Sequence, residues 1–225
     1  MDIATISARI TTNVNTLATA VTEFTNAFET TMKWIQRDWQ LYEANGARPL
    51  LTGAKVTLLE AATAWAIGSN RGAAASLRAA IENSIAWLYY KDHPIEFSSV
   101  KSRRSDLLLP KAVQSYFKAN DAGFEASYAM LAKLKNRPSE YYYSDVSEYV
   151  HAHPSFVLPG NINDLVITAP RDPSFLSIVK NTNEFITDNY TAFYRSSWGD
   201  FPESVQIYAS GKLGVSLTKF VEIAP

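Results

Sequence analysis

Apolar side chains recur every three or four residues through the first forty positions of the chain, from Ile3 to Trp39. This spacing places them along one stripe of an amphipathic helix. Threonine is frequent in the same stretch and lowers intrinsic helix propensity, so packing of the stripe must stabilise the helix. Gly46 and Pro49 then end the pattern. The sequence therefore predicts one long helix over residues 3–42, within an N-terminal unit of residues 1–50.

Further helical patterns follow with short breaks between them. Pro94 is expected to open a helix, Pro110 to interrupt the next stretch, and Asp121 to cap the helix after it. Ser144 is expected to be the N-cap of a later helix, with Ser147 in its first turn. The other predicted helices cover residues 52–69, 70–90, 95–120, 122–135, 173–194 and 202–221.

A stretch rich in proline separates the middle helices from those at the end of the chain. Pro154, Pro159, Gly160 and Pro170 mark turns, which predicts an irregular crossing loop near residues 154–172. The whole pattern predicts an all-α helical bundle of four or more helices. We expect a single helical domain over residues 1–225, with a core at 52–155 and C-terminal helices at 173–225.

The composition excludes several classes of functional site. The chain has 225 residues, no cysteine and three histidines, so disulfides, thiolate nucleophiles, cysteine-ligated zinc and iron–sulfur clusters are excluded. No glycine-rich phosphate loop, HExxH motif or GxSxG motif is present. His151 and His153 stand two residues apart, which on a helix separates their rings by about 200° and prevents joint metal binding. We therefore expect no metal and no cofactor.

The start of the chain carries acidic and polar residues where a secretory signal has a basic start and an apolar run. The apolar stretches are also far shorter than the roughly 20 residues that a membrane span requires. These features predict a cytoplasmic protein that does not enter a membrane.

The near-neutral total of 21 basic and 22 acidic residues hides two opposed blocks. Residues 98–137 hold 8 basic and 3 acidic residues, a net charge of +5, and residues 138–190 hold 2 basic and 7 acidic residues, a net charge of −5. Either the blocks attract one another within the fold or across a homo-oligomer, or the basic block binds a polyanion such as RNA. The candidate nucleic-acid-binding residues are Arg103, Arg104, Lys111, Lys118, Lys133 and Lys135.

Two helical segments carry polar groups that point to chemistry. In the first, Arg78 and Glu82 stand four residues apart on one face of a very apolar helix. They form either a half-exposed ion pair or part of a polar group that lines a groove. In the second, Ser144, Ser147 and His151 share a helix face and offer hydroxyl groups and an imidazole. The alternative is a capping serine with a histidine bound to a backbone carbonyl.

These two segments, LRAAIENSIAWLYY and about sixty residues further on YSDVSEYVHAHPS, resemble HEPN-like helical proteins associated with bacterial defence and mobile-element genes. The resemblance covers residues 52–155. It implies a helical bundle, frequent dimerisation and, in the catalytic branch, metal-independent RNA cleavage. Arg78, Glu82, Ser147 and His151 are then the candidate catalytic residues.

The chain departs from that catalytic branch in one respect. The ribonucleases of that branch have a motif in which an arginine is followed, after four to six residues, by a histidine. Here the nearest arginine before His151 is Arg137. Cleavage would need Arg78 to meet His151 in space as a cation beside a general base. Tyr141, Tyr142, Tyr143 and Tyr149 could stack RNA bases, or serve as core or interface residues.

The resemblance thus implies a HEPN-like module of a bacterial defence or toxin–antitoxin type system that binds RNA or a protein partner, as a degenerate ribonuclease. An active endoribonuclease is the second interpretation. A non-catalytic oligomeric scaffold or a ligand-binding bundle is the third.

Overall fold

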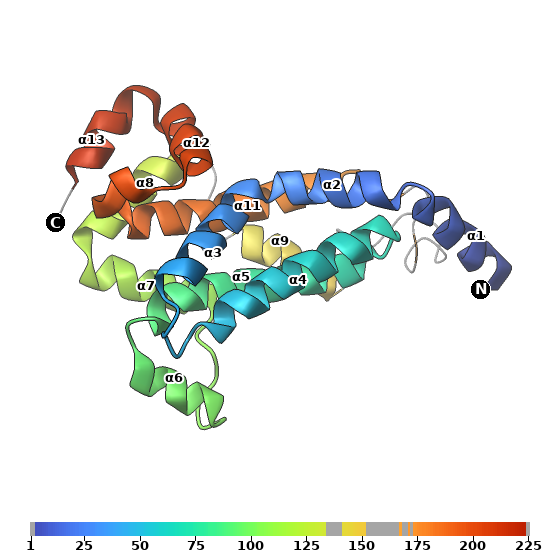
Figure 1. Ribbon diagram of the computed structural model, residues 1–225, viewed down its shortest axis with the longest axis horizontal. Coiled ribbons are helices and arrows are strands. Elements are labelled where there is room, and N and C mark those ends of the chain that lie inside the picture. Colours follow the sequence, from blue (N-terminus) through green and yellow to red (C-terminus); the bar gives the residue numbers. More distant parts are fainter. Residues whose placement is uncertain (1–2, 134–140, 152–166, 168–170, 172, 224–225) are drawn as a thin grey trace.

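The computed structural model describes residues 3–133, 141–151, 167, 171 and 173–223, and the regular structure in these ranges is entirely helical (Figure 1). The prediction of an all-α helical bundle is confirmed for this part of the chain. Among the described helices, none combines the length and the apolar character that a membrane crossing requires.

The centre of the bundle is a hairpin of two long helices, α4 (Pro49–Ala66) and α5 (Asn70–Tyr90). The turn between them includes Gly68, whose φ of 92° is a conformation that favours glycine. Alanines fill much of the buried surface of both helices and allow their backbones to approach closely. The fully buried alanines are Ala54, Ala61, Ala66, Ala73, Ala74, Ala80 and Ala86.

Helix α11 (Phe175–Phe193) packs against α5 and completes the core of the bundle (Figure 1). The N-terminal helices α2 (Leu17–Ala27) and α3 (Glu29–Leu41) cover α4 and also contact α11. Large aromatic side chains fill the space between these helices. Those with almost no exposed surface include Trp34, Trp65, Trp87, Tyr190, Phe24, Phe28 and Phe175.

The prediction of one long helix over residues 3–42 is wrong, because the chain bends twice. Helix α1 (Ile3–Val14) ends before Thr16, and α2 and α3 meet at Phe28, where φ is −109° and ψ is 14°. Near both bends, threonine hydroxyls such as those of Thr12 and Thr25 donate hydrogen bonds to carbonyls four residues earlier. Such bonds compete with the helix ladder and bend helices.

The bend at Phe28 rotates the buried face of α3. The apolar stripe predicts Trp39 as a buried residue, yet its side chain is 38% exposed. Ile35 of the stripe is buried, but Trp34 and Asp38, each one residue before a position of the stripe, are buried as well. The bend therefore leaves an indole on the surface and places a carboxylate in the core.

Asp38 joins three helices inside the bundle. Its Oδ2 accepts hydrogen bonds from Trp87 Nε1 of α5 and from the Tyr194 hydroxyl after α11, both at 2.7 Å. Its Oδ1 accepts a hydrogen bond from Arg37 Nη1 at 2.8 Å. Burial raises the pKa of Asp38, and the three donors oppose this shift by stabilising the carboxylate.

The prolines and Asp121 act as the sequence predicts. Pro94 and Pro110 occupy the first positions of α6 (Pro94–Lys101) and α7 (Pro110–Asn120). Asp121 Oδ1 accepts a hydrogen bond from the Phe124 amide at 3.0 Å, in the first turn of α8 (Ala122–Lys133). Pro110 thus separates two helices within the stretch 95–120.

The last part of the chain forms a small helical layer at the end of the bundle near α8 (Figure 1). The 3₁₀ segment η2 (Arg195–Asp200) leads to α12 (Glu203–Leu213) and then, through the 3₁₀ turn η3 (Gly214–Ser216), to α13 (Leu217–Glu222). The single helix predicted over residues 202–221 is therefore wrong. Gly214, with φ of 53°, interrupts it.

Most of the expected crossing loop at 154–172 lies outside the described residues. Two described residues of this stretch contact the N-terminal side of the bundle. The Ile167 carbonyl accepts a hydrogen bond from Arg9 Nη1 at 2.8 Å. Arg171 donates one to the Thr16 hydroxyl at 2.8 Å and lies 5.3 Å from the Trp65 ring centroid.

Candidate functional site

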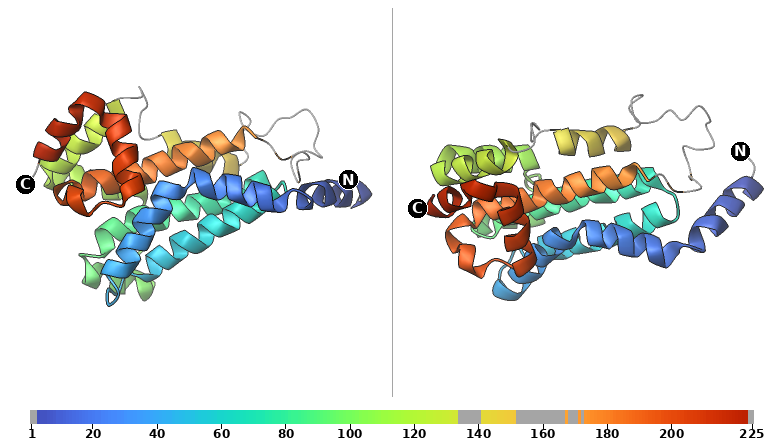
Figure 2. Two further views of the ribbon diagram at one scale, coloured as in Figure 1. Left: turned by 45° about the horizontal axis from the view of Figure 1, so that its top comes forward. Right: turned by 90° about the horizontal axis from the view of Figure 1, so that it is seen from above.

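The two polar segments singled out in the sequence meet where α9 (Tyr141–Val150) packs on α5 (Figure 2). Arg71, near the start of α5, donates from Nε to the Val150 carbonyl at the end of α9, at 2.9 Å. Glu82, one turn beyond Arg78, bonds Tyr143 near the start of α9. The two helices therefore run in opposite directions.

Glu82 is the acceptor at the centre of this site. Its Oε1 accepts hydrogen bonds from the Tyr143 hydroxyl at 2.5 Å and from Arg78 Nε at 3.0 Å. Arg78 Nε also lies 3.1 Å from the Tyr143 hydroxyl oxygen, so its proton is shared between two acceptors. One carboxylate oxygen thus links the two helices.

Arg78 connects this group to His151, which directly follows α9. Arg78 Nη1 lies 3.1 Å from His151 Nε2. A guanidinium can only donate, so Nε2 accepts and the imidazole carries its proton on Nδ1. We call Arg78, Glu82, Tyr143 and His151 the α5–α9 cluster.

The α5–α9 cluster is reached by solvent. The side chains of Arg78 and Glu82 are 29% and 23% exposed, and His151 is exposed. The hydrogen bond from Arg78 to Glu82 raises the pKa of Arg78. Burial, and next its bond to Glu82, raises the pKa of Tyr143, so the phenol remains a donor. With a neutral imidazole the cluster has one positive and one negative charge.

The structure brings together Arg78, Glu82 and His151 but not Ser147. The Ser147 Oγ is buried and has no hydrogen-bond partner among the described residues. Tyr143 joins the cluster although the sequence assigned it only to an aromatic group. It stands four residues before Ser147 and eight before His151, so the helical spacing of this face carried the signal.

The expected N-cap at Ser144 is wrong, because α9 begins three residues earlier at Tyr141. The tyrosines before Ser144 continue the helix without a cap at that position. This earlier start is what places Tyr143 on the helix face that meets α5.

The candidate nucleic-acid-binding residues do not gather around this cluster. Arg103 and Arg104 follow α6, beyond the end of α5, and Tyr90 at that end is twelve residues or about 18 Å from Arg78. Lys111 and Lys118 are exposed on α7. Lys133 ends α8, and Lys135 lies outside the described residues.

The ion pairs of the two charged blocks include partners from the C-terminal part of the chain. Asp121 of the basic block accepts two hydrogen bonds from the guanidinium of Arg195, at 2.7 and 2.9 Å. Asp188 of the acidic block binds Lys212 Nζ and accepts a bond from the Tyr208 hydroxyl at 2.9 Å. Both pairs fasten the C-terminal layer to the bundle.

Within the described ranges, no three histidine or acidic side chains come close enough together to hold a metal ion. His93 lies between α5 and α6 and stacks on Tyr89, with ring centroids 3.8 Å apart. Its Nδ1 donates to the Tyr89 carbonyl at 2.7 Å. His93 is thus held by structural contacts away from the α5–α9 cluster.

Comparisons with models of protein families, with curated proteins and with solved structures found no match for this chain. The function is therefore inferred from the geometry of the site.

Proposed function

We propose that this chain is an RNA-binding helical module and that the α5–α9 cluster is its polar site. The observation that carries the proposal is the 3.1 Å contact between Arg78 Nη1 and His151 Nε2 on a solvent-accessible face. A planar guanidinium can donate hydrogen bonds to a phosphate, and an imidazole beside it can hydrogen-bond a ribose hydroxyl. The HEPN-like resemblance, with a role in a defence or toxin–antitoxin type system, belongs to the same proposal.

Arg78 keeps a donor for a ligand. Its Nε and Nη1 are used within the cluster, whereas Nη2 donates no hydrogen bond to any described residue. A phosphate oxygen can bind there without breaking the contact with Glu82. The basic side chains of α7, Lys111 and Lys118, then add charge along the same strand of RNA.

Glu82 gives the proposal a sharp test, because its carboxylate reduces the attraction of Arg78 for an anion. In Glu82→Gln the amide oxygen still accepts from Arg78 and Tyr143, but the negative charge is gone. We expect this variant to bind RNA about three- to tenfold more tightly than the wild type, as expected for one removed like charge near a phosphate. A site that only joins α5 to α9 predicts unchanged binding.

The binding assay is fluorescence anisotropy with a labelled, unstructured 20-nucleotide RNA, at 50 and 200 mM KCl. If four phosphates are neutralised, the affinity falls about fiftyfold over this range. Arg78→Gln is expected to lose binding and Arg78→Lys to retain part of it. Lys219→Gln removes an exposed charge on α13 and serves as the control. Absence of RNA binding by the wild type at 50 mM KCl overturns the proposal.

Metal-independent RNA cleavage is the second candidate, and the pairing of His151 with Arg78 favours it. His151 Nε2 would take the proton of the ribose 2′-hydroxyl, and Arg78 would stabilise the charge on the phosphorane. The 2′-hydroxyl must first replace Arg78 as the partner of Nε2. Cleavage in EDTA that leaves 2′,3′-cyclic phosphate ends, and that stops in His151→Ala, is the expected result. If the RNA stays intact, the cleavage proposal is wrong and the RNA-binding proposal is unaffected.

A non-catalytic clamp is the contrasting interpretation, favoured by the way the cluster's atoms bind one another. The variant Arg71→Gln distinguishes a clamp from an RNA-binding site, because Arg71 binds the Val150 carbonyl of α9 but is not part of the cluster. A clamp predicts that Arg71→Gln and His151→Ala lower thermal stability alike and leave RNA binding unchanged. Light scattering on the same samples tests the expected homo-oligomer.

A further inference from the structure

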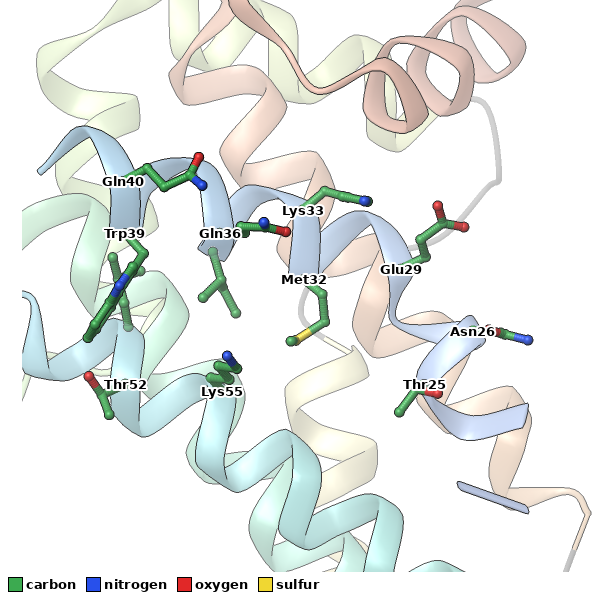
Figure 3. A pocket seen from close by; sticks show the side chains of 12 residues that line it. Thr25, Asn26, Glu29, Met32, Lys33, Gln36, Trp39, Gln40, Thr52 and Lys55 are labelled. Atoms are coloured by element: carbon green, nitrogen blue, oxygen red, sulfur yellow. The ribbon is translucent and has the colours of Figure 1, made fainter. Parts of the chain in front are cut away.

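A groove runs along the opposite side of the bundle from α9, between α3 and α4 (Figure 3). Its volume is about 700 Å³. Met32, Ile35 and Leu51 give it an apolar floor, and Trp39 and Lys55 line it from the two facing helices. Trp39 extends from α3 toward α4, and Lys55 extends from α4 toward α3. The polar cluster on α5 and α9 does not contribute to this groove.

Trp39 exposes part of its indole ring to the groove. The Arg48 guanidinium carbon lies 3.6 Å from the centroid of the indole, which covers one face of the ring. The side chain is nevertheless 38% exposed and lines the groove. Stacking by Arg48 fixes the orientation of the indole, so a planar ligand can stack on the remaining surface without ordering the side chain itself.

Lys55 places a positive charge above the apolar floor. It is exposed and forms no ion pair with any described residue. Lys33 and Glu29 also line the groove and extend away from α4 (Figure 3), and their opposite charges cancel in its net charge. The net charge of the lining is therefore a single positive charge, equal to that of Lys55, which favours an anion.

The groove's dimensions favour a small molecule over a protein segment. A volume of 700 Å³ falls within the 300–1,000 Å³ that is usual for small-molecule sites. Thr52 lies opposite Trp39, and Lys55 is three residues further along α4, or about 4.5 Å along the helix axis (Figure 3). A ligand can thus stack a ring on Trp39 while an acidic group about one helical turn away meets the ammonium.

From these features we infer that the groove binds a small aromatic anion, with its ring on Trp39, its acidic group on Lys55 and its apolar body over Met32, Ile35 and Leu51. The inference does not depend on RNA binding, because the groove and the α5–α9 cluster share no residue. Either proposal, ligand binding in the groove or RNA binding at the cluster, can therefore be refuted without affecting the other.

The probe is 8-anilinonaphthalene-1-sulfonate, an aromatic anion whose fluorescence rises in an apolar site, titrated into the full chain. Trp39→Ala and Lys55→Gln are each expected to weaken its binding about tenfold, from the loss of the stacking surface or of the charged contact. Lys219→Gln, an equally exposed lysine on α13, leaves binding unchanged. Near-UV circular dichroism establishes that each variant keeps the wild-type fold.

The uncharged analogue N-phenyl-1-naphthylamine separates the two contacts. We expect the wild type to bind it about tenfold more weakly than the sulfonate, and Lys55→Gln to bind both compounds alike. Equal binding of the two compounds by the wild type overturns the role of Lys55. Wild-type affinity for the sulfonate in both Trp39→Ala and Lys55→Gln overturns the site.

Discussion

Replacing Asp38 with asparagine perturbs the buried hydrogen bonds that join α3 to α5 and to the end of α11. The amide oxygen can take the place of Oδ2 and accept from Trp87 and Tyr194. The amide nitrogen then faces Arg37 Nη1, so two donors meet where a charged hydrogen bond of 2.8 Å existed. The substitution keeps the size of the side chain and changes only this pairing and the charge.

The expected loss of stability follows from the hydrogen bonds that the substitution removes. One hydrogen bond to a charged group contributes about 1.5–3 kcal/mol, so Asp38→Asn should lower the free energy of unfolding by about 2 kcal/mol. For a chain of this length the melting temperature then falls by about 4–8 °C. Asp38→Ala leaves Trp87 and Tyr194 as buried unpaired donors, at about 1–3 kcal/mol each, and should be the less stable variant.

The contribution of Asp38 to the free energy of unfolding changes with pH in a definite direction. Because burial raises the pKa of Asp38 in the folded state, the native chain binds this proton more tightly than the unfolded chain. The resulting stability is fully present below the ordinary pKa of 3.8 and is lost as the pH rises through the raised value. The wild type should therefore exceed Asp38→Asn in stability by more at pH 4 than at pH 7.

Urea denaturation followed by circular dichroism and by tryptophan fluorescence measures both effects. Asp106→Asn is the control, since Asp106 is exposed and its substitution should change stability by less than about 0.5 kcal/mol. Stability of Asp38→Asn equal to that of the wild type, or a deficit that grows as the pH rises, would refute this role of Asp38.

Other predictions concern the attachment of the C-terminal layer. A Cβ at Gly123 would lie 2.6 Å from Arg195 Nε, so Gly123→Ala should displace the guanidinium from its carboxylate partner and cost about 1.5–3 kcal/mol in chemical denaturation. Gly211→Ala, in α12 with open space around it, should instead stabilise the chain by about 0.5–1 kcal/mol in the same assay. Lys212→Met leaves the buried Asp188 uncompensated and should cost about 3–5 kcal/mol at pH 7, with the deficit shrinking as the pH falls, and added Asp188→Asn should recover part of it. A deficit in Gly211→Ala as large as that in Gly123→Ala, or a double variant no more stable than Lys212→Met, would contradict these contacts.

The sequence predicts the helices whose ends carry proline, glycine or a capping side chain. Pro94, Pro110 and Asp121 fix φ or satisfy amides locally, so their effect does not depend on the rest of the fold. The bends near Thr16 and Phe28 have no such marker, and the apolar stripe keeps its spacing through both. They coincide with hydrogen bonds from threonine hydroxyls such as those of Thr12 and Thr25, and threonine is too frequent in the whole stretch to mark where a bend falls.

Half of the α5–α9 cluster can be read from one helix. Arg78 and Glu82 are four residues apart, so their ion pair follows from helix geometry alone. Their contacts with Tyr143 and His151 require α9 to dock on α5, and the interpretation of Ser144 as a cap placed Tyr143 outside the helix. The groove beside Trp39 likewise depends on how α3 packs on α4, which the pattern of a single helix does not contain.

The alanine-lined hairpin of α4 and α5 has a consequence for how the molecule opens. Its amides lie in the part of the bundle with the closest backbone approach, so their hydrogens should exchange with solvent only when the whole chain unfolds. At the other extreme is α1, where Ile3 is 83% exposed and Asn13 is the one residue described as buried. Exchange should therefore progress from the N-terminal helix toward the hairpin, and the slowest amides of α5 should report the global free energy of unfolding.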